Sequence, residues 1–426
     1  MARSFLEPPA KKLRDFQSNY STPSRISRSD IPRLSSLRPQ TTSIASAGSV
    51  QNISLSLTQN VNIVIQGATS IAETDDNFVC ATLDWRPIEK CNYNQCPRGK
   101  AGLLNLDLKK KGLINAIKGH QLSRAGMGAS IEAEQYGKDI VVLKNLVKEL
   151  HLDPKTQPKA LSPSGYYDEK WFNSFLEVSR QEVVDGVTHH IYNLGLGDDP
   201  NMITKIQDPS YLNQVAQTYK GVSNIVNKFK PQSRAWVFKS GRALHGGAKD
   251  VSQTFANGFW YFDQLGMAST YNHKVFCSVL LWHRLMGSTV LAVTQESNQN
   301  LRVYAHCAKK KPGISIIFIN LSKDSSFNVT LSNYEHQSRN LRTTNVAKPN
   351  YEFRGYQNRE EYHLAALAGN IQGQIVLLND IQMVPTKTFD IPAIEPKLVN
   401  ASTPISVAAH SIVYVTIRDF QAPLCA

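Results

Sequence analysis

The chain has 426 residues, 41% of them hydrophobic and 19% charged, so it is long enough for two or three globular domains with a large buried core. Its formal net charge of +13 at pH 7 attracts polyanions such as uronic-acid polysaccharides, nucleic acids or anionic membranes without choosing among them. No segment reaches the roughly 18 uninterrupted apolar residues that a membrane-spanning helix needs.

Residues 1–58 are rich in Ser, Arg, Pro and Thr and show no apolar periodicity, so we expect a disordered tail. Eight Lys and Arg against three Asp and Glu give this tail a net charge of +5. A nucleic-acid or membrane tether is the alternative interpretation. Residues 1–17 lack the apolar run of roughly 7 to 15 residues that a secretory signal requires, so we expect no signal peptide in this chain.

Six cysteines are present, and their spacing matches no zinc-ligand pattern, so we predict no metal site. They are Cys80, Cys91, Cys96, Cys277, Cys307 and Cys425. Four sequons for N-glycosylation are typical of a secreted glycoprotein. Their asparagines are Asn52, Asn320, Asn328 and Asn400.

The first predicted elements follow the tail. Residues 61–66 alternate and are β-branched, and residues 77–84 follow an acidic turn, so both segments indicate strands. Residues 103–108 form another short apolar piece. Residues 132–150 place apolar side chains along one stripe with charges opposite, which predicts an amphipathic helix.

From residue 159 onward, short strands and helices alternate along the chain. The predicted strands are 159–162, 186–192 and 234–240, and the predicted helices are 168–181, 209–228 and 250–265. This rhythm favours a parallel sheet, most simply part of a (β/α)8 barrel. From about residue 288 the pattern changes to short strands separated by turns, which indicates a β-sandwich. These strands are 302–306, 314–320, 327–331, 374–378 and 411–417.

Several long motifs carry a resemblance to one family. They are FVCATLDW at 78–85, KCNYNQCPRGKAGLLNLDL at 90–108, GVTHHIYNLGLG at 186–197, FANGFWYFDQLGMASTYNHKVFC at 255–277, LLWHRLMG at 280–287 and REEYHL at 359–364. From about Val61 to Cys425 the chain resembles the plant heparanase-like proteins of glycoside hydrolase family 79. The resemblance implies a (β/α)8 barrel, a β-sandwich that receives strands from both chain ends, and retaining cleavage of β-glucuronides by two glutamates.

The acid/base glutamate of that family lies in a motif of the form GNELSGxGxGA. This chain has GHQLSRAGMGA instead, so Gln121 stands where the glutamate belongs and His120 replaces the asparagine. A glutamine amide cannot donate a proton to a leaving oxygen. A long segment that normally precedes this motif is absent, and the resemblance implies that barrel strands two to four are largely deleted with it.

The nucleophile motif of the family has the form AWVGEAGG, and residues 235–242 of this chain are AWVFKSGR. Lys239 therefore stands in the place of the nucleophile, where an ammonium would repel the positive charge that develops at the anomeric carbon. A family loop is also absent after Cys277, which implies that the eighth barrel strand is largely deleted.

Some pocket and disulfide positions of the family remain. Asp84, His190 and Tyr192 match residues that contact the substrate or orient the nucleophile, although they are also compatible with packed remnants of a lost site. Cys307 and Cys425 match the disulfide of the family's sandwich, which would form in an oxidising compartment.

We therefore expect four parts: a tail at 1–58, a sandwich strand at 59–72, an incomplete barrel at 73–288 and a sandwich at 289–426. The expected function is that of a family 79 glycosidase of the β-glucuronidase type whose catalytic glutamates are lost, leaving it inactive. One alternative is an active β-glucuronidase gene whose coding sequence is mis-assembled here, which sequencing the transcript would decide. The other is a non-catalytic protein that binds acidic glycans.

The resemblance also implies partners and a location. We expect no cofactor and no metal, acidic polysaccharides or glucuronides as ligands, no nucleic-acid partner, and a monomer. The family implies a secreted, cell-wall or vacuolar and lysosomal protein with peripheral membrane association.

Overall fold

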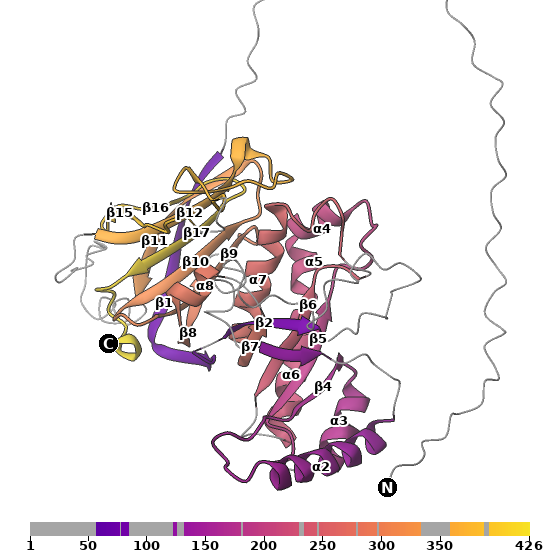
Figure 1. The fold of residues 1–426 in the computed structure, drawn as a ribbon. Coiled ribbons are helices and arrows are strands. Elements are labelled where there is room, and N and C mark those ends of the chain that lie inside the picture. The colour runs from indigo at the N-terminus through magenta and orange to yellow at the C-terminus, as the bar shows by residue number, and fades with distance from the viewer. Residues whose placement is uncertain are drawn as a thin grey trace, which may run out of the picture. The chain divides into compact units, whose positions relative to one another are not determined.

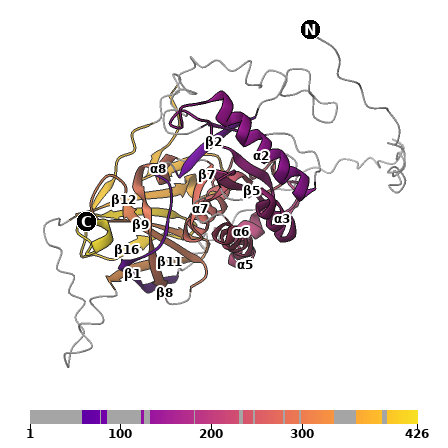
Figure 2. The same cartoon turned by 90° about the horizontal axis from the view of Figure 1, so that it is seen from below.

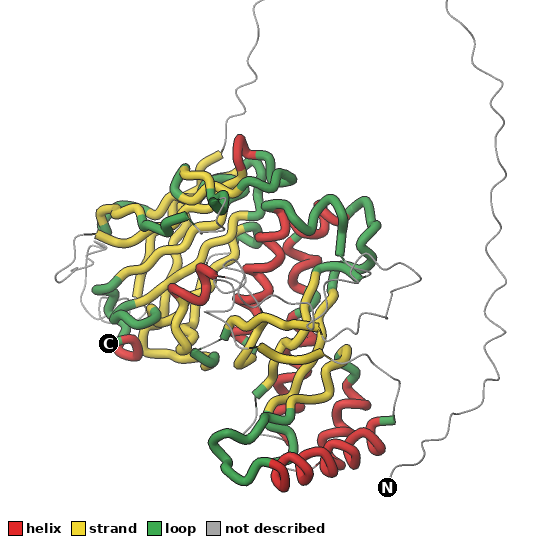
Figure 3. Tube along the Cα trace, in the orientation of Figure 1, coloured by secondary structure: helices red, strands yellow, loops and turns green. Residues whose placement is uncertain are grey.

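A computed structural model of the chain describes eleven stretches, and everything below concerns them. They are residues 57–76, 78–84, 122–125, 132–179, 182–229, 234–244, 247–277, 280–295, 298–333, 358–386 and 392–426. Residues 1–56 of the predicted tail, the apolar piece at 103–108, Gln121 and Asn52 lie outside the described residues, whereas Leu57 and Thr58, predicted as the end of the tail, belong to the strand β1. The described part contains two sheets, and Figure 3 shows most helices beside one of them, while the other consists mainly of strands and loops.

The first sheet has six described strands in the order β3-β2-β7-β6-β5-β4, and all of its paired neighbours are parallel (Figure 1). The strands are β2 Val79–Asp84, β3 Leu122–Ala125, β4 Leu161–Tyr166, β5 Gly186–Tyr192, β6 Ala235–Gly241 and β7 His273–Cys277. Parallel strands need helical crossovers, which supply the covering layer of this sheet.

The strand β7 corrects one expectation from the resemblance. It follows β6 and one helix in the chain, and it pairs with β6 on one side and with β2 on the other. In a (β/α)8 barrel the eighth strand joins the seventh to the first in this way. The prediction that this strand is largely deleted is therefore wrong: the residues before the junction at Cys277 are sufficient to form it.

Seven helices are described. They are α2 Ala133–Leu150, α3 Glu169–Ser179, α4 Met202–Gln207, α5 Pro209–Asn213, α6 Ala216–Phe229, α7 Ala256–Thr270 and α8 Leu280–Leu285. The single helix predicted at 209–228 is two helices. The first begins where the Asp208 carboxylate accepts a hydrogen bond from the Ser210 amide. In Figures 1 and 2, α2 lies beside α3, and α3 also contacts α6. Phe175 and Val222 are fully buried in the core that these helices share with β5.

The second sheet has eleven strands, in the order β14-β13-β12-β17-β10-β9-β8-β1-β11-β16, with β15 paired to β12. Their bounds are β1 Leu57–Glu73, β8 Met286–Gln295, β9 Leu301–Ala308, β10 Ile314–Asn320, β11 Ser325–Asn333, β12 Asn358–Ala366, β13 Val376–Leu378, β14 Ile381–Gln382, β15 Lys397–Asn400, β16 Ile405–Val407 and β17 Ile412–Ile417. The N-terminal strand β1 lies inside this sheet, antiparallel to β8 and parallel to β11.

The strand β10 shows how this sheet separates two cores. All seven of its residues are buried, and alternate side chains point to opposite faces. Ile317 and Ile319 belong to the core that contains α7, whereas Ile316 and Phe318 belong to a second core inside the sandwich. A strand that is covered on both faces needs the continuous apolar sequence found here.

The helix α7 connects the two sheets. Nearly all of its residues are buried, because it packs on the parallel sheet and on the second sheet at once. Its Tyr261 ring lies 5.8 Å from the ring of Phe276 in β7, and its Phe262 ring lies 5.7 Å from that of Tyr414 in β17. The helix begins six residues later than the sequence indicated, because residues 250–254 form turns.

The glycines of α7 provide a direct test of this packing. A methyl group added at Gly266 would lie 2.2 Å from the Tyr304 ring, whereas one at Gly258 would meet its nearest atom, on Ile412, at 3.5 Å. We expect Gly266→Ala to lower the free energy of unfolding by about 1–3 kcal/mol through overpacking. Gly258→Ala should be neutral or gain up to about 1 kcal/mol in helix propensity. Chemical denaturation of both variants measures this, and equal effects would contradict the packing described.

The sandwich is closed by a covalent bond and an ionic network. Cys307 of β9 forms a disulfide with Cys425, the pairing that the resemblance implies. The REEYHL motif lies in β12, where Arg359 donates to the Glu361 carboxylate at 2.6 Å and to four backbone carbonyls between residues 400 and 404. Burial raises the pKa of Glu361, but hydrogen bonds from His363 and Arg359 outweigh it and leave that pKa below its ordinary value.

One predicted glycosylation site does not fit the fold. Asn320 is fully buried, and its Nδ2 donates to the carbonyls of Ser325 at 2.7 Å and Ala408 at 2.8 Å. A glycan on this nitrogen would remove one of its two N–H donors, and it would have no room at a fully buried position, so the prediction for Asn320 is wrong. Asn400 lies exposed at the end of β15 and Asn328 is partly exposed in β11, so both stay predictions. No described helix is long and apolar enough to cross a membrane.

Candidate active site

Three neighbouring strands of the parallel sheet end at one edge with polar and aromatic side chains. Tyr166 is the last residue of β4, Tyr192 the last of β5, and Gly241 the last of β6. His190 is paired with Lys239, and Tyr192 with Gly241. Because the carboxyl ends of parallel strands meet at one edge, these residues form one group, and in a (β/α)8 barrel that edge carries the active site.

Aromatic rings cover the β4 and β5 side of this group. The Tyr166 ring lies 6.2 Å from the ring of His190 and 6.1 Å from that of Tyr192, with edge-on geometry in both cases. Gly241 lies beside them, and a methyl group there would stand 2.8 Å from the Tyr192 ring. The glycine of the AWVFKSGR motif therefore makes room for Tyr192.

Lys239 is partly exposed on β6, one strand from His190. The structure thus brings together three residues that the sequence singled out: Lys239, His190 and Tyr192. Asp84 ends β2, which is separated from β6 by β7, and only its backbone is described. Gln121 lies outside the described residues.

Arg242 was not singled out from the sequence, and it fixes the loop after β6. Its side chain is almost fully buried, with the guanidinium donating to Asn257 Oδ1 and to Ser252 Oγ. Burial lowers the pKa of Arg242 to about 10. Its carbonyl accepts from the Leu194 amide at 2.8 Å, which ties the loops after β5 and β6 together. The last position of the motif, which is glycine in the family form, thus has a structural role in this chain.

A buried histidine pair lies in the same sheet, where His189 directly precedes His190 but packs against Tyr219 of α6. The Nε2 atoms of His189 and His273 are 2.8 Å apart, and His273 Nδ1 lies 3.2 Å from the Tyr271 carbonyl. His273 Nδ1 must donate to that carbonyl, so its Nε2 accepts from His189. Burial lowers the pKa of His273 to about 3, and burial together with the neighbouring His273 holds the pKa of His189 well below its ordinary range. This neutral pair belongs to the core.

Two acidic residues of the described loops near this edge, Asp168 and Asp199, already have partners. Asp168 accepts a hydrogen bond from the Trp171 amide at 2.8 Å at the start of α3. Asp199 forms an ion pair with Lys205 at 2.5 Å, and this bond lowers the pKa of Asp199. No group of three or more His, Cys, Asp or Glu among the described residues could hold a metal ion.

Comparison with known proteins agrees with this architecture. Residues 60–122 and 118–266 match the N-terminal domain of glycosyl hydrolase family 79. Heparanase-like protein 2 from Arabidopsis thaliana is 32% identical, covering 86% of this chain and 95% of that protein. Baicalin-beta-D-glucuronidase from Scutellaria baicalensis is 25% identical, covering 81% of this chain and 90% of that protein.

A solved structure shares the fold. The GH51 arabinofuranosidase from Xanthomonas axonopodis pv. citri aligns with a TM-score of 0.54 and 11% identity, over 84% of this chain and 99% of that chain. The parallel sheet with its strand-end group, together with the strand-rich second sheet, defines a glycosidase-type fold. The chain belongs to glycosyl hydrolase family 79 as a relative of the plant heparanase-like proteins.

Proposed function

We propose that this chain is a heparanase-like protein that keeps the family architecture without hydrolysing β-glucuronides. The observation that carries the proposal is the chemistry of the strand ends. Among the six described strands of the parallel sheet, the one acidic residue is Asp84, on β2. The strand that resembles the family's nucleophile strand presents the ammonium of Lys239.

The chemistry of retention explains why these residues matter. Retaining cleavage needs two carboxyl groups about 5 to 5.5 Å apart: one protonates the leaving oxygen and the other attacks the anomeric carbon. An ammonium cannot supply the negative charge that stabilises the oxocarbenium-like transition state. An amide at Gln121 cannot exchange the proton. The substrate class, a β-glucuronide, is suggested by the related baicalin-beta-D-glucuronidase.

The proposal is tested by assaying the purified chain on a chromogenic β-glucuronide. The parent chain should show no turnover above buffer. The double revertant Gln121→Glu with Lys239→Glu restores the two carboxylates. We expect it to hydrolyse the β-glucuronide faster than the parent chain. A control carrying Lys249→Glu makes the same charge change as Lys239→Glu alone, at an exposed position away from these sites, and should stay inactive.

The outcomes separate two causes of inactivity. Turnover by the parent chain at a rate typical of glycosidases, about 1–1000 per second, would refute the proposal. If neither the parent nor the revertant is active, the missing barrel segments account for the loss. We propose that these segments include strands two and three, and six parallel strands among the described residues support this.

A second candidate function is binding of acidic glycans without cleavage. It is favoured by Lys239 at the strand-end group and by the formal net charge of +13. Retention on a uronic-acid polysaccharide that falls as salt rises would support it. A secreted or vacuolar location, peripheral membrane association and a monomeric state stay predictions.

A further inference from the structure

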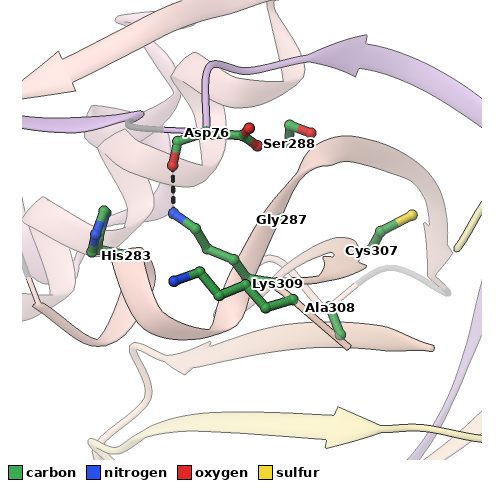
Figure 4. Close-up of a pocket in the computed structure, with 8 residues that line it drawn as sticks. Asp76, His283, Gly287, Ser288, Cys307, Ala308 and Lys309 are labelled. Atoms are coloured by element: carbon green, nitrogen blue, oxygen red, sulfur yellow. Dashed lines mark hydrogen bonds between the residues drawn. The ribbon is translucent and has the colours of Figure 1, made fainter. Parts of the chain in front are cut away.

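A cavity of about 300 Å³ lies apart from the strand-end group, and we call it the lysine pocket. It is lined by Asp76, His283, Gly287, Ser288, Cys307, Ala308, Lys309 and Lys310 (Figure 4). Asp76 precedes β2, so the pocket lies at the amino end of that strand, whereas the strand-end group lies at the carboxyl ends of β4, β5 and β6 in the same parallel sheet.

The charges in the pocket favour an anion. Two lysines face one carboxylate in the lining, and neither Lys309 nor Lys310 forms an ion pair with an acid among the described residues. Lys309 Nζ donates to the backbone carbonyl of Asp76 rather than to its carboxylate (Figure 4). Burial lowers the pKa of Lys309, with Asp76 and Asp75 opposing and Lys310 reinforcing this effect. An added anion would stabilise both ammonium groups.

The walls of the pocket are held in place independently of the lysines. The Lys309 amide donates to the Leu285 carbonyl at 2.9 Å, and His306 Nδ1 lies 2.7 Å from the Gly287 carbonyl. Thr74 donates twice to the Ser288 carbonyl, through its amide at 2.8 Å and its hydroxyl at 3.2 Å. The Cys307 disulfide fixes the end of β9. A rigid frame lowers the entropic cost of binding a small ligand.

We infer that the lysine pocket binds a small oxyanion, a carboxylate or sulfate group carried on a sugar-sized molecule. Lys309 and Lys310 provide charge-assisted hydrogen bonds, and His283 and Ser288 add polar side chains to the lining. The volume is at the lower end of the range for small-molecule sites, which suits one sugar ring. This inference does not depend on the proposed function, because none of the pocket residues belongs to the strand-end group.

The test is calorimetric titration of the full chain with sodium glucuronate, sodium sulfate and glucose at low ionic strength. We expect glucuronate to bind and glucose not to bind. The double variant Lys309→Gln with Lys310→Gln should bind glucuronate at least about tenfold more weakly. A matched double variant, Lys323→Gln with Lys397→Gln, removes two exposed charges elsewhere and should change the affinity less than about twofold.

Sulfate distinguishes the two sources of the anion. Binding of sulfate as tight as that of glucuronate, lost in the same variant, supports a site for any oxyanion. Binding of glucuronate alone supports a site for a sugar carboxylate. Equal affinities in the parent and the Lys309 and Lys310 variant, or no binding beyond that of glucose, would overturn the inference. If Lys239→Gln binds glucuronate as tightly as the parent chain, the binding occurs in the lysine pocket and not at the candidate active site.

Discussion

Asparagine in place of Asp263 is expected to lower the free energy of unfolding by about 3–5 kcal/mol. Asp263 lies in α7 with no exposed side-chain surface, and one of its oxygens accepts from Arg302 Nε at 2.8 Å and from the Tyr304 hydroxyl at 2.6 Å. Burial alone would lower the pKa of Arg302, but the Asp263 carboxylate raises it above its ordinary value. The neutral amide would leave a largely buried guanidinium without its counterion.

Urea denaturation monitored by circular dichroism measures this loss. The control is Asp139→Asn on α2, an exposed carboxylate whose described bond is to Gln135, and it should cost less than about 1 kcal/mol. Combining Asp263→Leu with Arg302→Met removes both charges and should cost less than Asp263→Asn alone, because no charge is left buried. If Asp263→Asn is as stable as the parent chain, this ion pair does not hold α7 to the second sheet.

Stability is also expected to fall steeply between pH 7 and pH 5. His189, His273 and His306 are fully buried, and burial lowers the pKa of His273 to about 3 and that of His306 to about 4. The unfolded chain takes up protons near pH 6.5, whereas the folded chain does not until the pH approaches those lowered values. Stability is therefore complete above about pH 6.5 and decreases as the pH falls, by on the order of 2 kcal/mol per histidine at pH 5.

Denaturation midpoints of the parent chain and of the variants His306→Gln and His151→Gln, measured at pH 7 and at pH 5, test this prediction. His306→Gln should show a smaller difference between pH 7 and pH 5 than the parent chain, by on the order of 2 kcal/mol. His151→Gln, at an exposed position after α2, should show the same difference as the parent. An identical pH dependence in all three chains would mean that the buried histidines do not govern acid stability.

The sequence correctly predicted the elements that have a clear periodic pattern of apolar side chains. The strands 186–192 and 314–320 have the predicted bounds, and the helix predicted at 132–150 begins one residue later. The bounds of elements that depend on helix capping or on contacts with distant residues were predicted less accurately. The helix predicted at 250–265 begins at Ala256, and residues 209–228 are interrupted between α5 and α6.

The candidate site was predictable only where a family motif covered it. His190, Tyr192 and Lys239 lie in such motifs, and the structure groups them at one sheet edge. The structural role of Arg242 could not be predicted from the sequence. Its hydrogen-bond acceptors, Ser252 and Asn257, lie in a later turn and in a later helix. The lysine pocket could not be predicted, since its lining joins segments more than 200 residues apart in the chain. The burial of Asn320 was hidden for the same reason, because one of its two acceptors is Ala408.

The position of β1 has a consequence for biosynthesis. Residues 57–73 leave the ribosome among the first of the described chain, yet their partners Ser325–Asn333 and Met286–Gln295 are made more than 200 residues later. The nascent chain must keep this apolar segment from aggregating until its neighbours emerge, and such a high contact order slows folding. A fragment that begins after residue 73 would therefore carry a gap in the middle of its largest sheet.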